Sequence, residues 1–294
     1  MFTETAADLP GSADPFIPSF KVLTIMQVPH MLGPRLVAAD TWLLGSCLPV
    51  PGLGVLPVNS CVIRSAEPVL VDTGLAAVRE DFLAALTRVI DPADLRWIWI
   101  THMDPDHVGN LEAVLELAPN ARIVTTYLGM GKMGLLGLPQ DRAWLLNPAQ
   151  GLDVGDRSLV AVVPPTFDAP ETTGLFDSRS RALFSADCFG AVQSELVEDA
   201  GLIDAAALRD GMRLWTSVDA PWLHSVRRAE LDRALDRVCG LAPEVVLGSH
   251  LQPARGITER LAANLSACAG APGFVGPDQK ALEAMMASML PEAA

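Results

Sequence analysis

Four side chains of the kinds that bind metals fall within six consecutive positions of this chain, directly after an apolar segment. The apolar segment 95–100 predicts a buried strand, and residues 108–117 predict a helix. Between them lies Thr101-His-Met-Asp-Pro-Asp-His107, with two histidines and two carboxylates. Because carboxylates two positions apart repel each other, a bound cation is the simplest way to hold them together. Since α/β folds place their sites at the carboxyl ends of strands, the stretch favours a metal site over a solvated loop.

Length and composition narrow the classes of protein that the sequence can encode. Half of the 294 residues are apolar and only 19% are charged, which is typical of a folded chain with a large core. The net charge of −14 argues against a nucleic-acid partner, because phosphate binding needs a basic surface. We expect no membrane span and no signal peptide, since neither pattern occurs in the sequence. Five widely separated cysteines without a C-x-x-C pair favour free buried thiols in a cytoplasmic protein.

Strands and helices alternate along the chain in two similar series, and in each series strands end in polar residues. We expect strands over 21–26, 40–45, 58–63, 67–74, 95–100, 121–125, 158–163, 174–177, 182–185 and 244–250, with a Pro/Gly-rich loop over 49–54. We expect helices over 76–90, 108–117, 128–138, 204–240 with a break at Pro221, 257–268 and 277–290. This order favours an α/β fold in which two mixed sheets pack together with helices on the outer faces. The predicted boundaries are an N-terminal arm over 1–20, a domain over 21–270 and a C-terminal helical extension over 271–294.

Four separated motifs of this chain, in their order, resemble those of the metallo-β-lactamase superfamily. They are Val71-Asp-Thr-Gly74, Thr101-His-Met-Asp-Pro-Asp-His107, Ser185-Ala-Asp187 and Gly248-Ser-His250. Within that superfamily the chain looks most similar to the di-iron domain of flavodiiron proteins, over roughly residues 22–260. The resemblance implies the superfamily's αββα sandwich.

The resemblance also implies a ligand set for two metal ions. Carried over residue by residue, metal A falls to His102 and Asp104, metal B to Asp106, His107 and His250, and the bridge between them to Asp187. The family's third histidine is absent, and the best-placed substitute is Asp168, with Glu171 as the fallback. Asp106 is also the predicted catalytic residue. Asp72 is expected either behind the metals, orienting a ligand, or as a cap of the turn that follows it.

The carboxylates in this set bear on the choice of metal. Four of the seven predicted ligands are aspartates, and carboxylate oxygens are hard ligands that suit iron or manganese better than zinc. We therefore expect two metal ions, with iron favoured and manganese or zinc as the alternatives. A degenerate site, holding only metal B or no metal, is the competing interpretation.

Two reaction classes follow from such a site. The flavodiiron resemblance implies a centre that binds or reduces dioxygen or nitric oxide, and too few residues follow 260 for a flavodoxin-like domain, so a separate electron donor is expected. The alternative is a hydrolase whose metal-activated water attacks an ester, lactone or thioester. A metal-stabilised binding domain is a third hypothesis. The expected partners are a diatomic gas or small-molecule substrate and a second copy of the chain in a homodimer, with no nucleic acid or membrane.

Overall fold

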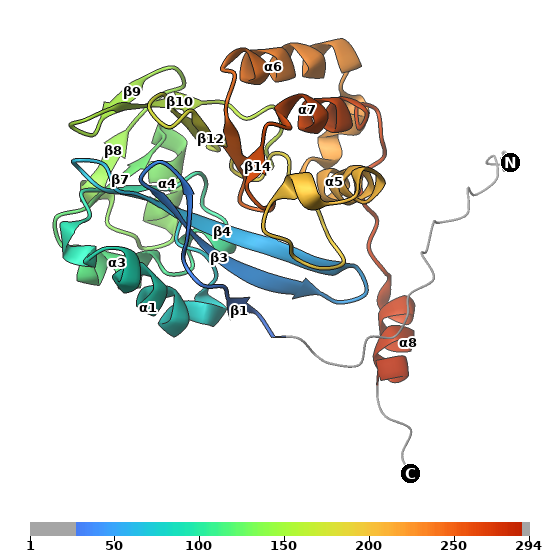
Figure 1. Cartoon of the computed structure of the whole chain (residues 1–294). Coiled ribbons are helices and arrows are strands. Elements are labelled where there is room, and N and C mark those ends of the chain that lie inside the picture. Colours follow the sequence, from blue (N-terminus) through green and yellow to red (C-terminus); the bar gives the residue numbers. More distant parts are fainter. Residues whose placement is uncertain (1–27, 290–294) are drawn as a thin grey trace, which may run out of the picture.

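Two mixed β-sheets pack face to face with helices on their outer surfaces (Figure 1). The structure is a computed structural model that describes residues 28–289, with side chains described up to residue 287. The predicted arm over 1–20 and the predicted strand over 21–26 lie outside the described residues. The predicted αββα architecture is confirmed.

The first sheet has eight strands in the order β1-β3-β4-β5-β6-β7-β8, and β2 pairs with β3. Its strands are β1 (His30–Met31), β2 (Arg35–Ala38), β3 (Thr41–Val50), β4 (Gly54–Ile63), β5 (Val69–Val71), β6 (Trp97–Trp99), β7 (Arg122–Thr125) and β8 (Ala143–Leu145). The strands from β5 to β8 run parallel, whereas β3, β4 and β5 pair in antiparallel fashion. The parallel strands β5 and β6 are buried throughout because both of their faces are covered, whereas β8 at the edge is partly exposed.

The second sheet has six strands in the order β14-β13-β12-β11-β10-β9. Its strands are β9 (Gly151–Asp153), β10 (Ser158–Val162), β11 (Gly174–Asp177), β12 (Ala182–Phe184), β13 (Val245–Leu247) and β14 (Ala254–Arg255). Only β12 and β13 run parallel in this sheet, so their carboxyl ends lie at the same edge.

The helices fall into two outer layers. The longer ones are α1 (Arg79–Val89), α3 (Leu111–Leu117), α4 (Tyr127–Leu135), α5 (Ala205–Asp219), α6 (Arg228–Gly240), α7 (Thr258–Ser266) and α8 (Gln279–Met289). In Figure 1, α1 and α3 lie beside the first sheet, whereas α5, α6 and α7 gather beside the second. Among the described residues, no helix is long and apolar enough to cross a membrane.

Three apolar clusters hold these layers together. Trp99 of β6 and Phe184 of β12 belong to the cluster between the sheets. Phe82 of α1 anchors the cluster outside the first sheet, and Met212 of α5 belongs to the cluster outside the second. Because both faces of each sheet are buried in this way, the strand ends at the sheet edges are where polar side chains can gather.

Local differences from the predicted elements have physical reasons. The predicted loop over 49–54 is shorter than expected, since β3 runs to Val50 and β4 starts at Gly54 in spite of Pro49 and Pro57. On their outer sides, β3 pairs with β1 and β2 only up to Cys47, and β4 pairs with β5 only from Cys61. Neither Pro49 nor Pro57 therefore faces an outer neighbouring strand, and the missing N–H is tolerated there. The predicted helix over 108–117 begins earlier, as α2 (Pro105–Val108), and breaks before α3. Proline suits the first turn of a helix, so Pro105 starts α2 directly after the strand.

Candidate metal centre

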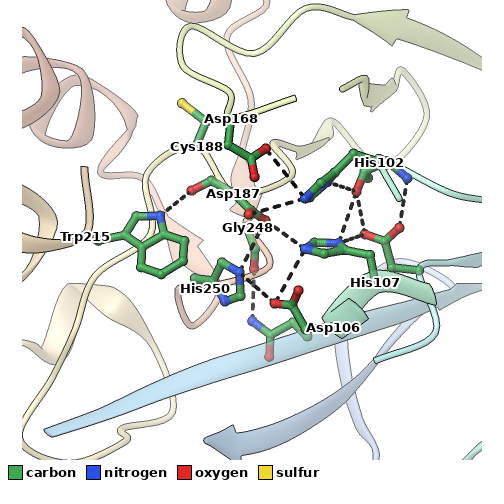
Figure 2. A network of polar contacts seen from close by, with 12 residues as sticks. His102, Asp106, His107, Asp168, Asp187, Cys188, Trp215, Gly248 and His250 are labelled. Carbon is green, nitrogen blue, oxygen red and sulfur yellow. Dashed lines mark hydrogen bonds and ion pairs between the residues drawn. The ribbon is translucent and has the colours of Figure 1, made fainter. Parts of the chain in front are cut away.

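The predicted ligand residues come from four strand ends that meet at one edge of the two sheets. The segment after β6 carries the 102–107 stretch, and the loop after β10 carries Asp168. Asp187 follows β12, and His250 follows β13. Residues far apart in the chain therefore face one another across the sandwich, as Figure 2 shows for six of them.

All seven predicted ligands lie in groups whose ligand atoms are within 4.8 Å of one another. The groups are His102–Asp104–Asp168, Asp106–His107–His250 and His102–His107–Asp187. The first two match the predicted division into two metals, and Asp187 lies where the bridge is expected, 3.0 Å from His107 Nε2 and 3.6 Å from His102 Nε2. The geometry thus brings the predicted residues together, and their ligand roles remain a prediction.

The three histidines are held by their Nδ1 atoms. His107 Nδ1 lies 2.9 Å from Asp72 Oδ2, and His250 Nδ1 lies 2.9 Å from the carbonyl oxygen of Pro57. His102 Nδ1 lies 3.2 Å from Thr101 Oγ1, whose own proton goes to Asp72. In each case Nδ1–H is the donor, so Nε2 is the nitrogen whose lone pair becomes available to a metal once the ring is neutral.

These Nε2 atoms are buried, and their polar neighbours are carboxylate oxygens. The Nε2 atoms of His102, His107 and His250 make no well-aligned hydrogen bond, nor does Asp187 Oδ1, although His107 Nε2 lies 3.0 Å from Asp187 Oδ1 and His250 Nε2 lies 3.3 Å from Asp106 Oδ2. All four residues are at most 6% exposed. Buried imidazole nitrogens and carboxylate oxygens that face one another at these distances fit the coordination shell of a cation.

Asp72 takes the place predicted behind the site. Its Oδ1 accepts a hydrogen bond from the backbone N–H of Thr101, at 2.8 Å, and its Oδ2 faces His107. The residue is 2% exposed, and its backbone is in the left-handed region at φ 55°. Ala186, just before Asp187, is also left-handed at φ 50°. Such strain is typical of positions that the surrounding structure must hold in place.

The charges of the site shift the pKa values of its members in opposite directions. Burial opposes ionisation, but His250 and His107 hold the pKa of Asp187 well below its usual value. Burial likewise opposes the charged imidazolium, but Asp187 and Asp106 raise the pKa of His250 to about 10. His250 and His107 outweigh burial at Asp106 and lower its pKa to about 2. Without a metal the site is therefore a set of ion pairs, and a cation that binds must displace protons.

Asp168 is less strongly paired than the other carboxylates. It lies 3.8 Å from His102 Nε2, and 31% of its side chain is exposed. Burial and the carboxylates of Asp104 and Asp187 raise its pKa, and His102 opposes this rise. The metal A side thus concentrates negative charge.

Three other side chains of ligand type lie outside these groups. Glu171, the fallback ligand, is buried in an ion pair 2.6 Å from Lys132 Nζ. His224 is exposed, with its Nδ1 2.6 Å from the carbonyl oxygen of Pro221. Cys188, next to Asp187, is a buried free thiol, and burial raises its pKa to about 12.

Two residues of α5 belong to the site although the sequence did not point to them. Trp215 Nε1 donates to the backbone oxygen of Asp187 at 3.0 Å, and its ring lies 4.4 Å from that of His250 between centroids (Figure 2). Asp219 shares a group with Asp168 and Asp187, and burial together with those two carboxylates raises its pKa to about 8. A tryptophan and an aspartate four positions apart are common on helices, so their spacing alone carries no signal.

Comparison with known proteins gives one family and a consistent set of structural neighbours. Residues 56–250 match the family described as ODP family beta lactamase. The chain is 30% identical over 145 residues to "Type A flavoprotein fprA" of Rhodobacter capsulatus, covering 45% of this chain and 32% of that protein. It is 27% identical over 156 residues to "Nitric oxide reductase" of Moorella thermoacetica, covering 51% of this chain and 39% of that protein.

The solved structures agree in fold. Rubredoxin oxygen:oxidoreductase from Desulfovibrio gigas superposes with a TM-score of 0.70 at 19% identity, covering 80% of this chain and 61% of that one. At this identity the likeness shows the fold alone. The chain spans less than half the length of the two relatives compared by sequence.

Proposed function

Because this chain belongs to the ODP family of beta lactamases, we propose that it is a dinuclear metal protein whose carboxylate-rich centre binds or reduces dioxygen or nitric oxide. Its fold is that of the flavodiiron core structures. Iron is the favoured metal, with manganese or zinc as the alternatives. In this proposal His102, Asp104 and Asp168 hold one metal, Asp106, His107 and His250 hold the other, and Asp187 bridges them.

The observation that carries the proposal is the convergence of buried ligand-type atoms at the centre. The Nε2 atoms of three histidines face the carboxylate of Asp187 at 3.0–3.6 Å, and the Nδ1 atom of each ring is held by a neighbouring oxygen. The donor set fits a pair of cations, because four carboxylates can balance the charge of two divalent ions. A redox-active pair would supply electrons and open coordination positions to a diatomic gas.

Neighbouring residues orient the histidine ligands of this centre, and one of its carboxylates is accessible to solvent. Asp72 fixes the ring of His107, and Pro57 fixes that of His250, so neither imidazole needs to reorient when a metal binds. Asp106, the predicted catalytic residue, approaches both rings and keeps 25% of its side chain exposed. Together with Asp168, it is one of the ligands that can face a molecule arriving from solvent.

The deciding experiment is metal analysis of the purified protein together with its visible spectrum and gas consumption. We expect two iron or manganese ions per chain after anaerobic loading with equal iron(II), manganese(II) and zinc(II). We also expect the iron form, given a chemical reductant, to consume nitric oxide or dioxygen. In this proposal the native electrons come from a separate electron donor. Colourless protein with zinc at both positions, active on an ester or lactone, would replace this proposal with the hydrolase alternative.

A further inference from the structure

Asp219, at the carboxyl end of α5, lies against the metal A side of the centre. One of its carboxylate oxygens lies within 4.8 Å of an oxygen of Asp168 and of one from Asp187. The residue is only 7% exposed, so water screens its charge poorly. Three carboxylates this close, two of them buried, repel one another unless a cation lies between them.

The packing of α5 fixes this position. Gly211, Trp215 and Asp219 are four residues apart, and therefore form one stripe along the helix. A Cβ on Gly211 would lie 2.2 Å from the carbonyl oxygen of Val192, so the helix backbone touches the segment that follows Asp187. One turn later, Trp215 donates to the backbone of Asp187 itself. The contacts that hold α5 against the segment around Asp187 thus also position Asp219, one helical turn after Trp215.

A second observation points from the other side to a ligand at this place. His102 is fully buried, and its Nε2 has no hydrogen-bond partner. That atom lies 3.6 Å from Asp187 Oδ2 and 3.8 Å from Asp168 Oδ1, so it is aimed at the same carboxylates. His102 and Asp219 therefore share two carboxylate neighbours, and an imidazole nitrogen beside carboxylates is a donor set that suits iron or manganese.

We propose that Asp219 is a further ligand of metal A, beyond the seven that the family resemblance supplies. This inference rests on the proposed dinuclear centre. With Asp219 the two metals are surrounded by five carboxylates, and five negative charges exceed the four positive charges of two divalent ions. The added carboxylate therefore favours a trivalent ion at metal A.

The test compares Asp219→Asn with Asp210→Asn, an exposed carboxylate of the same helix, 67% of whose side chain is exposed. Both variants are loaded anaerobically with manganese(II) or iron(II), and each metal's affinity is measured by competition with a chromophoric chelator. We expect Asp219→Asn to keep metal B and to bind metal A at least on the order of tenfold more weakly, because even residues behind the ligands cost about 10- to 100-fold. Asp210→Asn should match the unaltered protein, and Asp219→Glu should recover part of the loss.

The outcomes separate this inference from the proposed function. Two metals with unchanged affinities in Asp219→Asn would overturn the role of Asp219 and leave the dinuclear centre standing. No metal in the unaltered protein would overturn both. If Asp219→Asn fails to fold, an anomalous-scattering crystal structure of the manganese-loaded unaltered protein decides instead. An Asp219 oxygen at bonding distance from the metal supports the inference, and one outside the coordination shell ends it.

Discussion

Replacing Asp72 by asparagine tests whether a residue behind the ligands sets the chemistry of His107. Both carboxylate oxygens of Asp72 act as acceptors, Oδ1 towards the Thr101 N–H and Oδ2 towards His107 Nδ1. Asparagine keeps only one acceptor, so its amide N–H would face His107 if its oxygen stays on Thr101. The imidazole must then accept at Nδ1, which moves its proton to Nε2 and blocks the atom that faces the metals. Asparagine tolerates the left-handed backbone at this position, which keeps backbone strain out of the comparison.

The expected magnitude follows from the bonds that are lost. Loss of a hydrogen bond to a charged partner should lower the free energy of unfolding of the metal-free protein by about 1.5–3 kcal/mol. Metal affinity should fall on the order of 10- to 100-fold, as for other partners of ligating histidines. Because metal stabilises only the folded state, each tenfold loss should remove about 1.4 kcal/mol of the stabilisation gained at a fixed metal concentration.

The assay is chemical denaturation with and without manganese(II), beside a direct titration of metal binding. Asp177→Asn is the matched control, since Asp177 is a fully buried carboxylate paired with Arg157 and bonded to Ser180, remote from the predicted ligands. The Asp177→Asn variant should lower the free energy of unfolding by the same amount with and without manganese(II). The reasoning is refuted if Asp72→Asn binds metal as tightly as the unaltered protein.

Three further outcomes are expected. His107→Ala should reduce metal content from two ions towards one and lower the melting temperature of the loaded protein, whereas equal metal content and melting temperature would contradict the assignment. The double change of Asp104 and Asp168 to histidine removes two negative charges and should shift competitive loading from iron or manganese towards zinc; zinc at both positions already in the unaltered protein would refute the argument from hard ligands. Gly211→Ala should destabilise the protein by about 1–3 kcal/mol in denaturation, because its Cβ would lie 2.2 Å from the oxygen of Val192. An unchanged midpoint would show that α5 can move away.

The sequence was most informative where a ligand directly follows a strand. His102, Asp187 and His250 each come after an apolar run, and the meeting of strand ends at one edge made their convergence predictable. The strands β1, β2, β8, β9 and β14 were missed because they are only two to four residues long and, unlike β6, β12 and β13, do not lead into a predicted ligand. Asp219 was missed for another reason: it is brought in by packing of α5 on a glycine, a tertiary contact that leaves no local pattern.

The centre joins two halves of the chain that are distant in sequence, and this has a consequence for folding kinetics. In the proposed assignment each metal takes ligands both from the segment after β6 and from strand ends of the second sheet. A metal can then bind tightly only after the two sheets have docked, so it cannot guide the early, local steps of folding. The same geometry works in reverse, because opening of the docked sheets separates the ligands of each metal. We therefore expect the bound metal to protect the amides of β6, β12 and β13 from hydrogen exchange. Metal release should speed up under conditions that favour this sub-global opening.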